Sequence, residues 1–245
     1  MSIAAVLVTA LVAAGLAMLG PAVIARIPEP APPGLEHERD QAVPPEVPPE
    51  EPKEPYAAIA ALPRLGIGMA VVAAVVGALV GWSVGWTGVV PLWCYVVPLG
   101  VVLAVVDWRT RLLPTRLIAP SYGVVVVLAL VAAWLDGSRH ELFRAGYGWL
   151  VWGGVFVLLW LVYPRGMGYG DVRLSGLLGI ATGVLGWAEM LVGLYAAFLL
   201  GGVIGFALSR LGVVERKNYP FGPFMVLGAV IGVLVGAPIA QGLGY

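Results

Sequence analysis

The chain has 245 residues, of which 60% are hydrophobic and 11% charged, whereas roughly 25% are charged in an average soluble domain. This composition excludes a water-soluble globular protein, because such a chain lacks the polar groups to cover its surface. Acidic and basic residues balance at 14 each, so no nucleic-acid partner is indicated, and the single cysteine excludes an intramolecular disulfide. We therefore expect an all-α, polytopic membrane protein.

Long uncharged stretches predict about eight transmembrane helices, since about 20 apolar residues cross the hydrocarbon core of a bilayer. The stretch 65–106 is long enough for two helices, with a turn near Gly85 to Pro91. The first helix is expected to be a retained span and not a cleaved signal peptide, because no Lys or Arg precedes it. The predicted helices cover residues 3–25, 65–84, 89–107, 117–135, 146–163, 172–188, 190–210 and 222–243.

Residues 28–55 differ from the rest of the chain. They contain ten of the 20 prolines and eight of the 14 acidic residues, a composition that keeps a segment extended with little to bury. A proline motif that binds a partner is an alternative to a plain solvated tether. We predict a first transmembrane helix in 1–27, a cytoplasmic disordered linker in 28–64, and a seven-helix membrane core in 65–245.

The basic residues predict the orientation, because cytoplasmic loops are enriched in Lys and Arg. With the N-terminus outside, 12 of the 14 basic residues fall in the inner loops, and only Arg139 and Arg144 fall outside. Glycines four residues apart, as in Gly228, Gly232 and Gly236, allow helices to approach closely in lipid. We expect this packing within the chain more than between two copies of it.

Two acidic residues lie in unusual places. Asp107 ends the apolar run 101–106, and Asp171 follows a glycine-rich stretch at the start of the sixth predicted span. The predicted topology places both at the cytoplasmic face, where an acid at the end of a span is a candidate functional residue. Alternatively, Asp107 pairs with Arg109 or Arg111, and Asp171 is stabilised by the dipole of its helix.

Two carboxylates brought together do not both ionise easily, so they share a proton. The ionised carboxylate then takes a proton from water, while the protonated one hydrogen-bonds the carbonyl under attack. This is the chemistry of an aspartic protease and needs no metal or cofactor. No metal site is predicted, because His37 and His140 fall on opposite sides of the membrane, and Cys94 is expected to be a packing residue.

Three sequence motifs resemble the prepilin peptidases, a family of GxGD intramembrane aspartyl proteases that removes leader peptides from type IV prepilins. The stretch 166–174, GMGYGDVRL, is similar to the GxGD motif of this family. Residues 107–114, DWRTRLLP, are similar to its first-aspartate segment, and residues 219–224, YPFGPF, to its PFGPF motif. All three fall on the predicted cytoplasmic side in the order of the family.

The resemblance implies catalytic roles for Asp107 and Asp171. It also implies an active-site loop and, more weakly, a cleft lining. The implied loop residues are Gly166, Met167, Gly168, Gly170 and Arg173, and the implied cleft residues are Arg109, Leu113, Pro114, Pro220, Phe221, Gly222 and Pro223. The implied protein is a multi-pass plasma-membrane enzyme, active at the cytoplasmic face. Its partners would be the lipid bilayer and prepilin or pseudopilin substrates with a basic leader and an apolar helix.

The sequence departs from the family pattern in three places. Arg173 replaces the usual Lys, Thr115 stands where Asp or Asn often follows Leu-Pro, and the linker replaces the cysteine-rich zinc domain of bifunctional members. The resemblance therefore implies a protease-only form, as in Flp or tight-adherence pilus systems, without N-methyltransferase activity. Two other classes are weighed against it: a proton-coupled transporter that uses the intramembrane Asp pair, and a non-catalytic membrane scaffold of the same fold.

Overall fold

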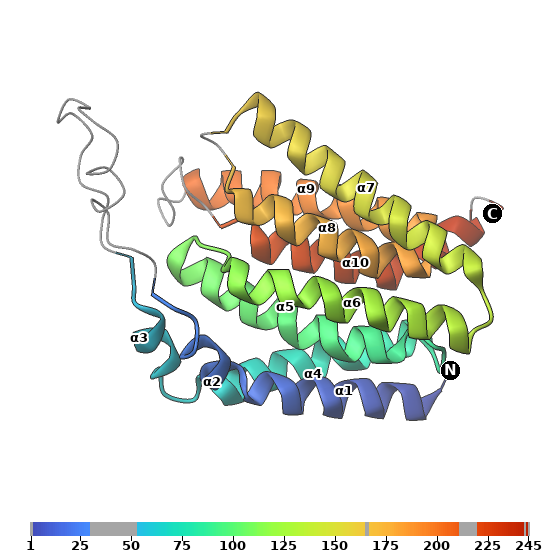
Figure 1. The fold of residues 1–245 in the computed structure, drawn as a ribbon, viewed down its shortest axis with the longest axis horizontal. Coiled ribbons are helices and arrows are strands. Elements are labelled where there is room, and N and C mark those ends of the chain that lie inside the picture. Colours follow the sequence, from blue (N-terminus) through green and yellow to red (C-terminus); the bar gives the residue numbers. More distant parts are fainter. Residues whose placement is uncertain (1, 30–52, 165–166, 211–219, 243, 245) are drawn as a thin grey trace.

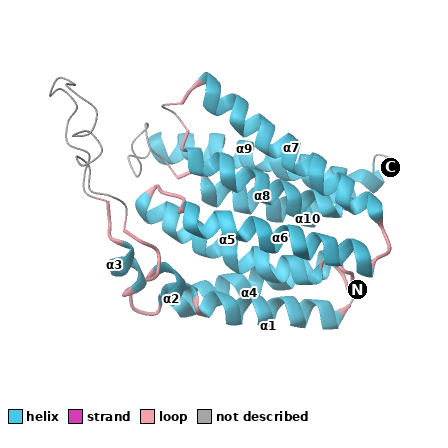
Figure 2. Ribbon diagram, viewed as in Figure 1, coloured by secondary structure: helices cyan, strands magenta, loops and turns pink. Residues whose placement is uncertain are grey.

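The computed structural model describes residues 2–29, 53–164, 167–210, 220–242 and 244. Over these ranges the chain forms helices joined by short connections, with no strand (Figure 2). The longer helices lie side by side as a bundle (Figure 1), which confirms the all-α prediction. The helices are α1 (Ile3–Met18), α2 (Gly20–Ile24), α3 (Tyr56–Ala60), α4 (Leu65–Val84), α5 (Val90–Thr110), α6 (Thr115–Leu135), α7 (Arg139–Val162), α8 (Tyr169–Leu185), α9 (Trp187–Arg210) and α10 (Gly222–Gly242).

Five of the described helices are long and apolar enough to cross a membrane: α4, α5, α6, α7 and α10. Helix α1 is also apolar but shorter. On the outer helices, large apolar side chains such as Val71, Leu130 and Leu158 are exposed, as expected for surfaces that face lipid. The bundle is therefore that of a polytopic membrane protein, while the exact number of spans and their orientation stay predictions.

Helices α5 and α8 are the innermost helices of the bundle. In α5, 78% of the apolar window is buried, against 22% in α7 and 28% in α4. In α8, almost every residue from Asp171 to Val184 is buried. The two aspartates singled out by the sequence thus lie on the two helices with the least contact with the surroundings.

Glycines bring neighbouring helices into backbone contact. A Cβ atom at Gly77 of α4 would lie 2.6 Å from the carbonyl oxygen of Thr9 in α1, and one at Gly228 of α10 would lie 2.6 Å from the amide nitrogen of Ala197 in α9. The hydroxyl of Thr9 also donates a hydrogen bond of 2.6 Å to the carbonyl oxygen of Gly77. The glycine spacing therefore serves packing within the chain, as expected.

Several helix boundaries differ from the predictions, by three residues at the end of α5, at the end of α8 and at the start of α9, and three further differences have a local explanation. The first predicted helix is divided at Leu19, because Pro21 in the first turn of α2 has no N–H to donate. Helix α7 begins at Arg139 instead of residue 146, since its charged first turns extend the helix beyond the apolar stretch. Helix α8 begins at Tyr169 instead of residue 172, so the end of the glycine-rich motif is helical and not part of a loop.

The predicted linker is only partly described, since residues 30–52 lie outside the described residues. Its final part is not irregular, because residues 56–60 form α3. The carboxylate of Glu29 accepts hydrogen bonds from the backbone N–H groups of Tyr56 (2.9 Å) and Ala57 (3.0 Å), and Tyr56 and Ile59 are buried. A carboxylate at its N-terminus and an apolar face against the bundle therefore stabilise this short helix.

The contact between α1 and α4 predicts that Gly77→Ala destabilises the protein. The added methyl group would press on the backbone at Thr9, and overpacking of this kind costs about 1–3 kcal/mol. Thermal unfolding of the purified protein in detergent checks this. Gly15→Ala is the matched control, because no atom lies within 4 Å of a Cβ atom at Gly15. Equal melting temperatures for the two variants would contradict the close contact.

Candidate active site

The three sequence motifs meet at one end of the bundle. Helix α5 ends there, three residues after Asp107, while α8 begins two residues before Asp171 and α10 begins at Gly222. The carboxylates of Asp107 and Asp171 are close enough to interact electrostatically. The expectation that the topology brings both acids to the same end of the helices is thus met in the fold.

Asp107 is held by the start of α10. Its side chain is 4% exposed, and its Oδ2 atom accepts a 2.8 Å hydrogen bond from the backbone N–H of Gly222. A Cβ atom at position 222 would lie 2.7 Å from that oxygen, so only glycine allows the contact without displacement. The first turn of a helix has free N–H groups and a partial positive charge, which suits a buried carboxylate.

Asp171 lies in the first turn of α8. The turn is closed by a 3.0 Å hydrogen bond from its own backbone N–H to the carbonyl oxygen of Gly168. Its side chain is 9% exposed. A Cβ atom at Gly168 would lie 3.2 Å from its Oδ2 atom. Its Oδ1 atom is buried and has no hydrogen-bond partner within the described part of the chain. A buried oxygen without a partner is costly in a purely structural position, which favours a functional role for Asp171.

Gly170 joins the GxGD motif to the connection between α5 and α6. A Cβ atom at Gly170 would lie 2.7 Å from Cβ of Leu113 and 3.3 Å from its carbonyl oxygen. Pro114 follows directly and is the N-cap residue of α6. The glycine therefore allows the start of α8 to contact the segment that follows Asp107, which brings the two aspartates together.

Arg173 connects the same two segments on the outside. Its guanidinium donates a hydrogen bond to the hydroxyl of Thr115 and lies 4.4 Å from the ring centre of Tyr169. The hydroxyl of Tyr122 in α6 donates a 2.6 Å hydrogen bond to the backbone carbonyl of Arg173. The two positions that depart from the family pattern, 115 and 173, are thus direct partners.

Arg109 does not neutralise Asp107. Its guanidinium forms a two-pronged ion pair with Glu54, with both nitrogen–oxygen distances 2.7 Å. The side chains are 41% and 30% exposed, respectively, so the pair contributes little to stability. The alternative prediction, in which Arg109 pairs with Asp107, is therefore wrong, because Arg109 pairs with Glu54.

The remaining predicted residues surround this end of the bundle. Phe221 contacts the rings of Phe156 and Phe198, with centroid distances of 5.7 and 5.8 Å. Pro220 is buried, while Pro223 and Met167 are half-buried. Gly166, also a predicted loop residue, lies outside the described residues.

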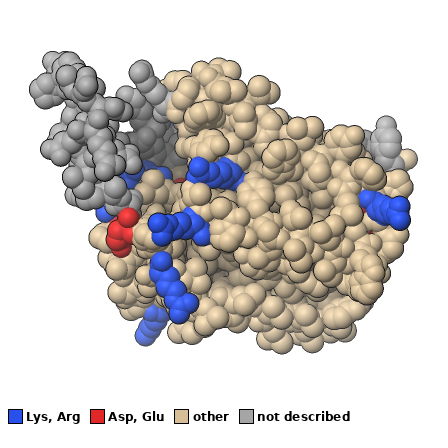
Figure 3. Space-filling view, viewed as in Figure 1, with Lys and Arg blue, Asp and Glu red and all other residues tan. Residues whose placement is uncertain are grey.

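The surface at this end is basic. Figure 3 shows blue side chains gathered at the left end of the bundle, with a separate blue group at the opposite end. The residues involved include Arg109 and Arg111 at the end of α5, Arg116 at the start of α6 and Arg173 in α8, whereas Arg139 begins α7 at the other end. Over the ranges that the structure describes, no three His, Cys, Asp or Glu side chains are placed to hold a metal ion.

Part of the chain, including both aspartates, is similar to a known protein family. Residues 94–206 match the type IV leader peptidase family, and this range contains both Asp107 and Asp171. The resemblance drawn from the motifs is confirmed for this part of the chain. The segment around Gly222, which binds Asp107, lies beyond the matched range.

Curated relatives agree with the family. A prepilin leader peptidase/N-methyltransferase of Escherichia coli K12 is 36% identical over 139 residues, covering 53% of this chain and 56% of that protein. Proteins of the same name from Pseudomonas aeruginosa and Dichelobacter nodosus are 33% and 32% identical, covering 57% and 59% of this chain and 47% and 49% of theirs. The chain spans about half the length of the curated relatives it matches. No solved structure matches it significantly.

Sequence reasoning missed three contributors to the site. Glu54 fell in the predicted linker, where nothing marked it as a partner of Arg109. Tyr122 sat in an apolar span, although a tyrosine in such a span usually needs a partner for its hydroxyl. Trp108, next to Asp107, is half exposed and lines an apolar pocket beside α5.

The closeness of the two aspartates predicts that cysteines in their places are joined by a short bifunctional thiol reagent. The background is Cys94→Ala, which removes the only native thiol. We expect Asp107→Cys with Asp171→Cys to form the internal crosslink, seen as a mobility shift or by mass spectrometry. Asp107→Cys with Glu189→Cys is the control, because Glu189 lies in the first turn of α9 at the opposite end. Equal crosslinking of both pairs, or of neither, would contradict the site.

Proposed function

We propose that this chain is an aspartic endopeptidase of the membrane that removes the basic leader from prepilin-like or pseudopilin-like substrates. The observation that carries this proposal is the pair of buried carboxylates, Asp107 and Asp171, at one end of the helix bundle. The family match and the names of the relatives support the reaction class. Because the chain spans only part of those relatives, its activity and substrates are part of the proposal.

The chemistry follows from two carboxyl groups that share one proton. The ionised carboxylate accepts a proton from a water molecule as the water oxygen attacks the carbonyl carbon of the scissile peptide bond. The protonated carboxyl donates its proton toward the carbonyl oxygen and so stabilises the tetrahedral intermediate. Collapse of this intermediate breaks the C–N bond, and the leaving amine takes up the proton that the first carboxylate had accepted.

The surroundings of the two groups favour one assignment of these roles. Asp107 accepts a hydrogen bond from the N–H of Gly222, and such a bond stabilises the ionised form of a carboxylate. Oδ1 of Asp171 has no hydrogen-bond partner among the described residues. An oxygen in such surroundings is better suited to carry a proton and donate it to the substrate. We assign Asp107 as the base and Asp171 as the acid in the first step.

The remaining residues position this pair. Gly168 and Gly170 allow the close contacts at the start of α8, and Arg173 fastens that start to Thr115. Gly222 contacts the carboxylate of Asp107, and Leu113 contacts Gly170 of the GxGD motif; we propose that Leu113, Pro114 and the segment 220–223 line the cleft. In this proposal none of them takes part in proton transfer.

The proposed location of the site is the cytoplasmic face of the cell membrane. Its basis is the basic end of the bundle, since Lys and Arg gather on the cytoplasmic side of membrane proteins. The proposal concerns the peptidase reaction. The expectation that the chain lacks N-methyltransferase activity rests on the sequence of the linker alone. The transporter and scaffold alternatives are not favoured by the family and the relatives.

Asp171→Asn tests the proposal directly. The change keeps the shape of the side chain but removes the exchangeable acid, so leader cleavage should fall by roughly 100-fold or more. The measurement is the mobility shift of a co-expressed prepilin-like substrate, with the amount of the variant in the membrane as control. Asp107→Asn should behave alike. Normal cleavage by either variant would refute the mechanism, and full function of the doubly substituted protein would favour the scaffold.

Gly222→Ala tests the role of the hydrogen bond to Asp107. The new methyl group would meet Oδ2 of Asp107 and displace the carboxylate, so cleavage should fall about tenfold or more. The protein should remain in the membrane. Gly123→Ala in α6 is the matched control, since no atom lies within 4 Å of a Cβ atom there. Unchanged cleavage by Gly222→Ala would show that this contact does not position the base.

A further inference from the structure

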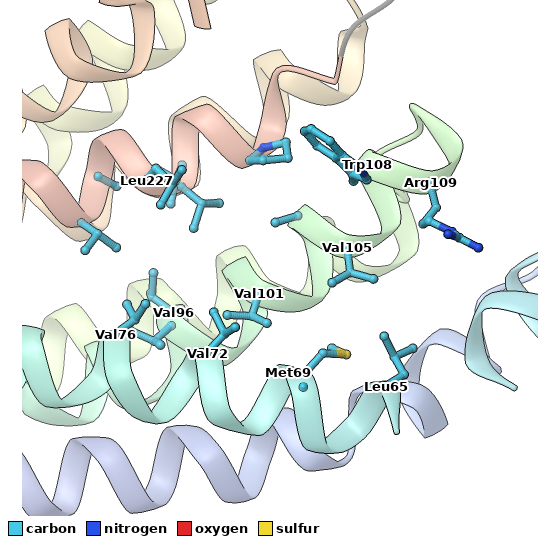
Figure 4. Close-up of a pocket in the computed structure, with 18 of the residues that line it drawn as sticks. Leu65, Met69, Val72, Val76, Val96, Val101, Val105, Trp108, Arg109 and Leu227 are labelled. Carbon is cyan, nitrogen blue, oxygen red and sulfur yellow. The ribbon is translucent and has the colours of Figure 1, made fainter. Parts of the chain in front are cut away.

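A long apolar groove, here called the lateral groove, lies between α4, α5 and α10. Its volume is about 730 Å³. Figure 4 shows Met69 and Val72 of α4 on one wall, Val101 and Val105 of α5 behind them, and Leu227 of α10 on the other wall. Apart from Arg64 and Arg109, the residues that line it are uncharged.

One end of the lateral groove lies near the candidate active site along α5 and α10. Along α5 it extends from Trp93 to Arg109, a distance of about 24 Å at 1.5 Å per residue. Trp108 and Arg109 follow Asp107 directly, and the lining residue Pro223 follows Gly222, which binds Asp107. One end of the groove is thus formed by residues adjacent in sequence to Asp107 and to Gly222, although neither aspartate lines it, while the other end lies near Trp93 of α5.

The far end of the groove contains an unsatisfied donor. Trp93 lines the groove and is 1% exposed, and its indole nitrogen has no hydrogen-bond partner within the described part of the chain. A buried N–H group is seldom left without an acceptor.

We propose that the lateral groove binds the apolar helix of the substrate and so places the adjoining peptide bond at Asp107 and Asp171. This inference rests on the proposed function and adds to it the surface that recognises the substrate. The ligand is a single apolar α-helix of about 16 or more residues, which at 1.5 Å per residue matches the length of the groove.

Shape and surface favour a helix as the occupant. A groove about 24 Å long covers most of the ~30 Å hydrocarbon core, so it suits a rod that crosses the membrane more than a compact molecule. Gly68, Ala104 and Ala229 lie among its lining residues, and a Cβ atom at Gly68 would meet nothing within 4 Å. Small residues of this kind let a second helix approach closely in lipid.

Two pairs of substitutions test the inference. Val72→Trp in α4 and Leu227→Trp in α10 each fill the groove from one of its walls. The matched controls are Val71→Trp and Val235→Trp, on the same two helices but outside the groove. The exposed fractions are 51% at Val72 and 58% at Val71, and 47% at Leu227 and 39% at Val235. The assay is cleavage of a reporter with a basic leader, a glycine and a long apolar helix.

We expect each groove variant to cleave the reporter about tenfold or more slowly, and each control to cleave it at the wild-type rate. Equal rates for Val72→Trp and Val71→Trp would overturn the groove as the binding surface. No cleavage by the wild-type protein would instead refute the proposed function, so the two failures are distinguishable.

Photo-crosslinking tests the inference without the tryptophan substitutions, which could disturb folding. A photoreactive phenylalanine analogue replaces Val72 or Val71 in the Asp171→Asn protein, which retains an uncleaved substrate. Crosslinks to the apolar helix of the reporter from position 72, and not from 71, support the inference. Crosslinks from position 72 to lipid alone would show that the groove holds acyl chains, and would overturn it.

Discussion

The site depends on two carboxylates held inside an apolar helix bundle. Burial of a charged group without partners is costly, yet Asp107 and Asp171 lie on the two innermost helices, 4% and 9% exposed. The N–H of Gly222 compensates Asp107 directly, whereas Oδ1 of Asp171 is left without a partner among the described residues. Such an arrangement contributes nothing to stability that an apolar pair would not, so its presence favours a chemical role.

Glycine makes this arrangement possible. Gly222 lies against the carboxylate of Asp107, Gly168 lies against that of Asp171, and Gly170 lies against Leu113. At Gly222 and Gly170 the contact joins an aspartate, or the segment that follows it, to another helix at a distance that a methyl group would prevent, while at Gly168 the close contact lies within the turn that holds Asp171. The glycines of the sequence motifs therefore serve close approach more than backbone freedom, since none of the three has a positive φ.

Much of the fold could be predicted because apolar runs and their charged ends are local signals. The ends of α4 and α10 and the turn after Val84 lie where the sequence predicts them, and the alternation of helices predicts that Asp107 and Asp171 share one end. Contacts between segments distant in sequence could not be predicted in this way. The capping of α3 by Glu29, the pairing of Arg109 with Glu54 and the groove beside α5 all join residues distant in sequence, and no local pattern encodes them.

In the proposed mechanism, the position of the lateral groove accounts for how a buried pair of carboxylates avoids indiscriminate cleavage. A soluble peptide has no apolar segment to place along α4, α5 and α10, so it would lose the binding energy that orients its peptide bond. A helix already in the bilayer reaches the groove by lateral diffusion, without first crossing an aqueous entrance. The length of the groove along α5 then determines which peptide bond of the substrate lies beside Asp107. In this arrangement selectivity comes from the depth of the substrate helix in the membrane, and the carboxylates need recognise only the peptide bond at its end.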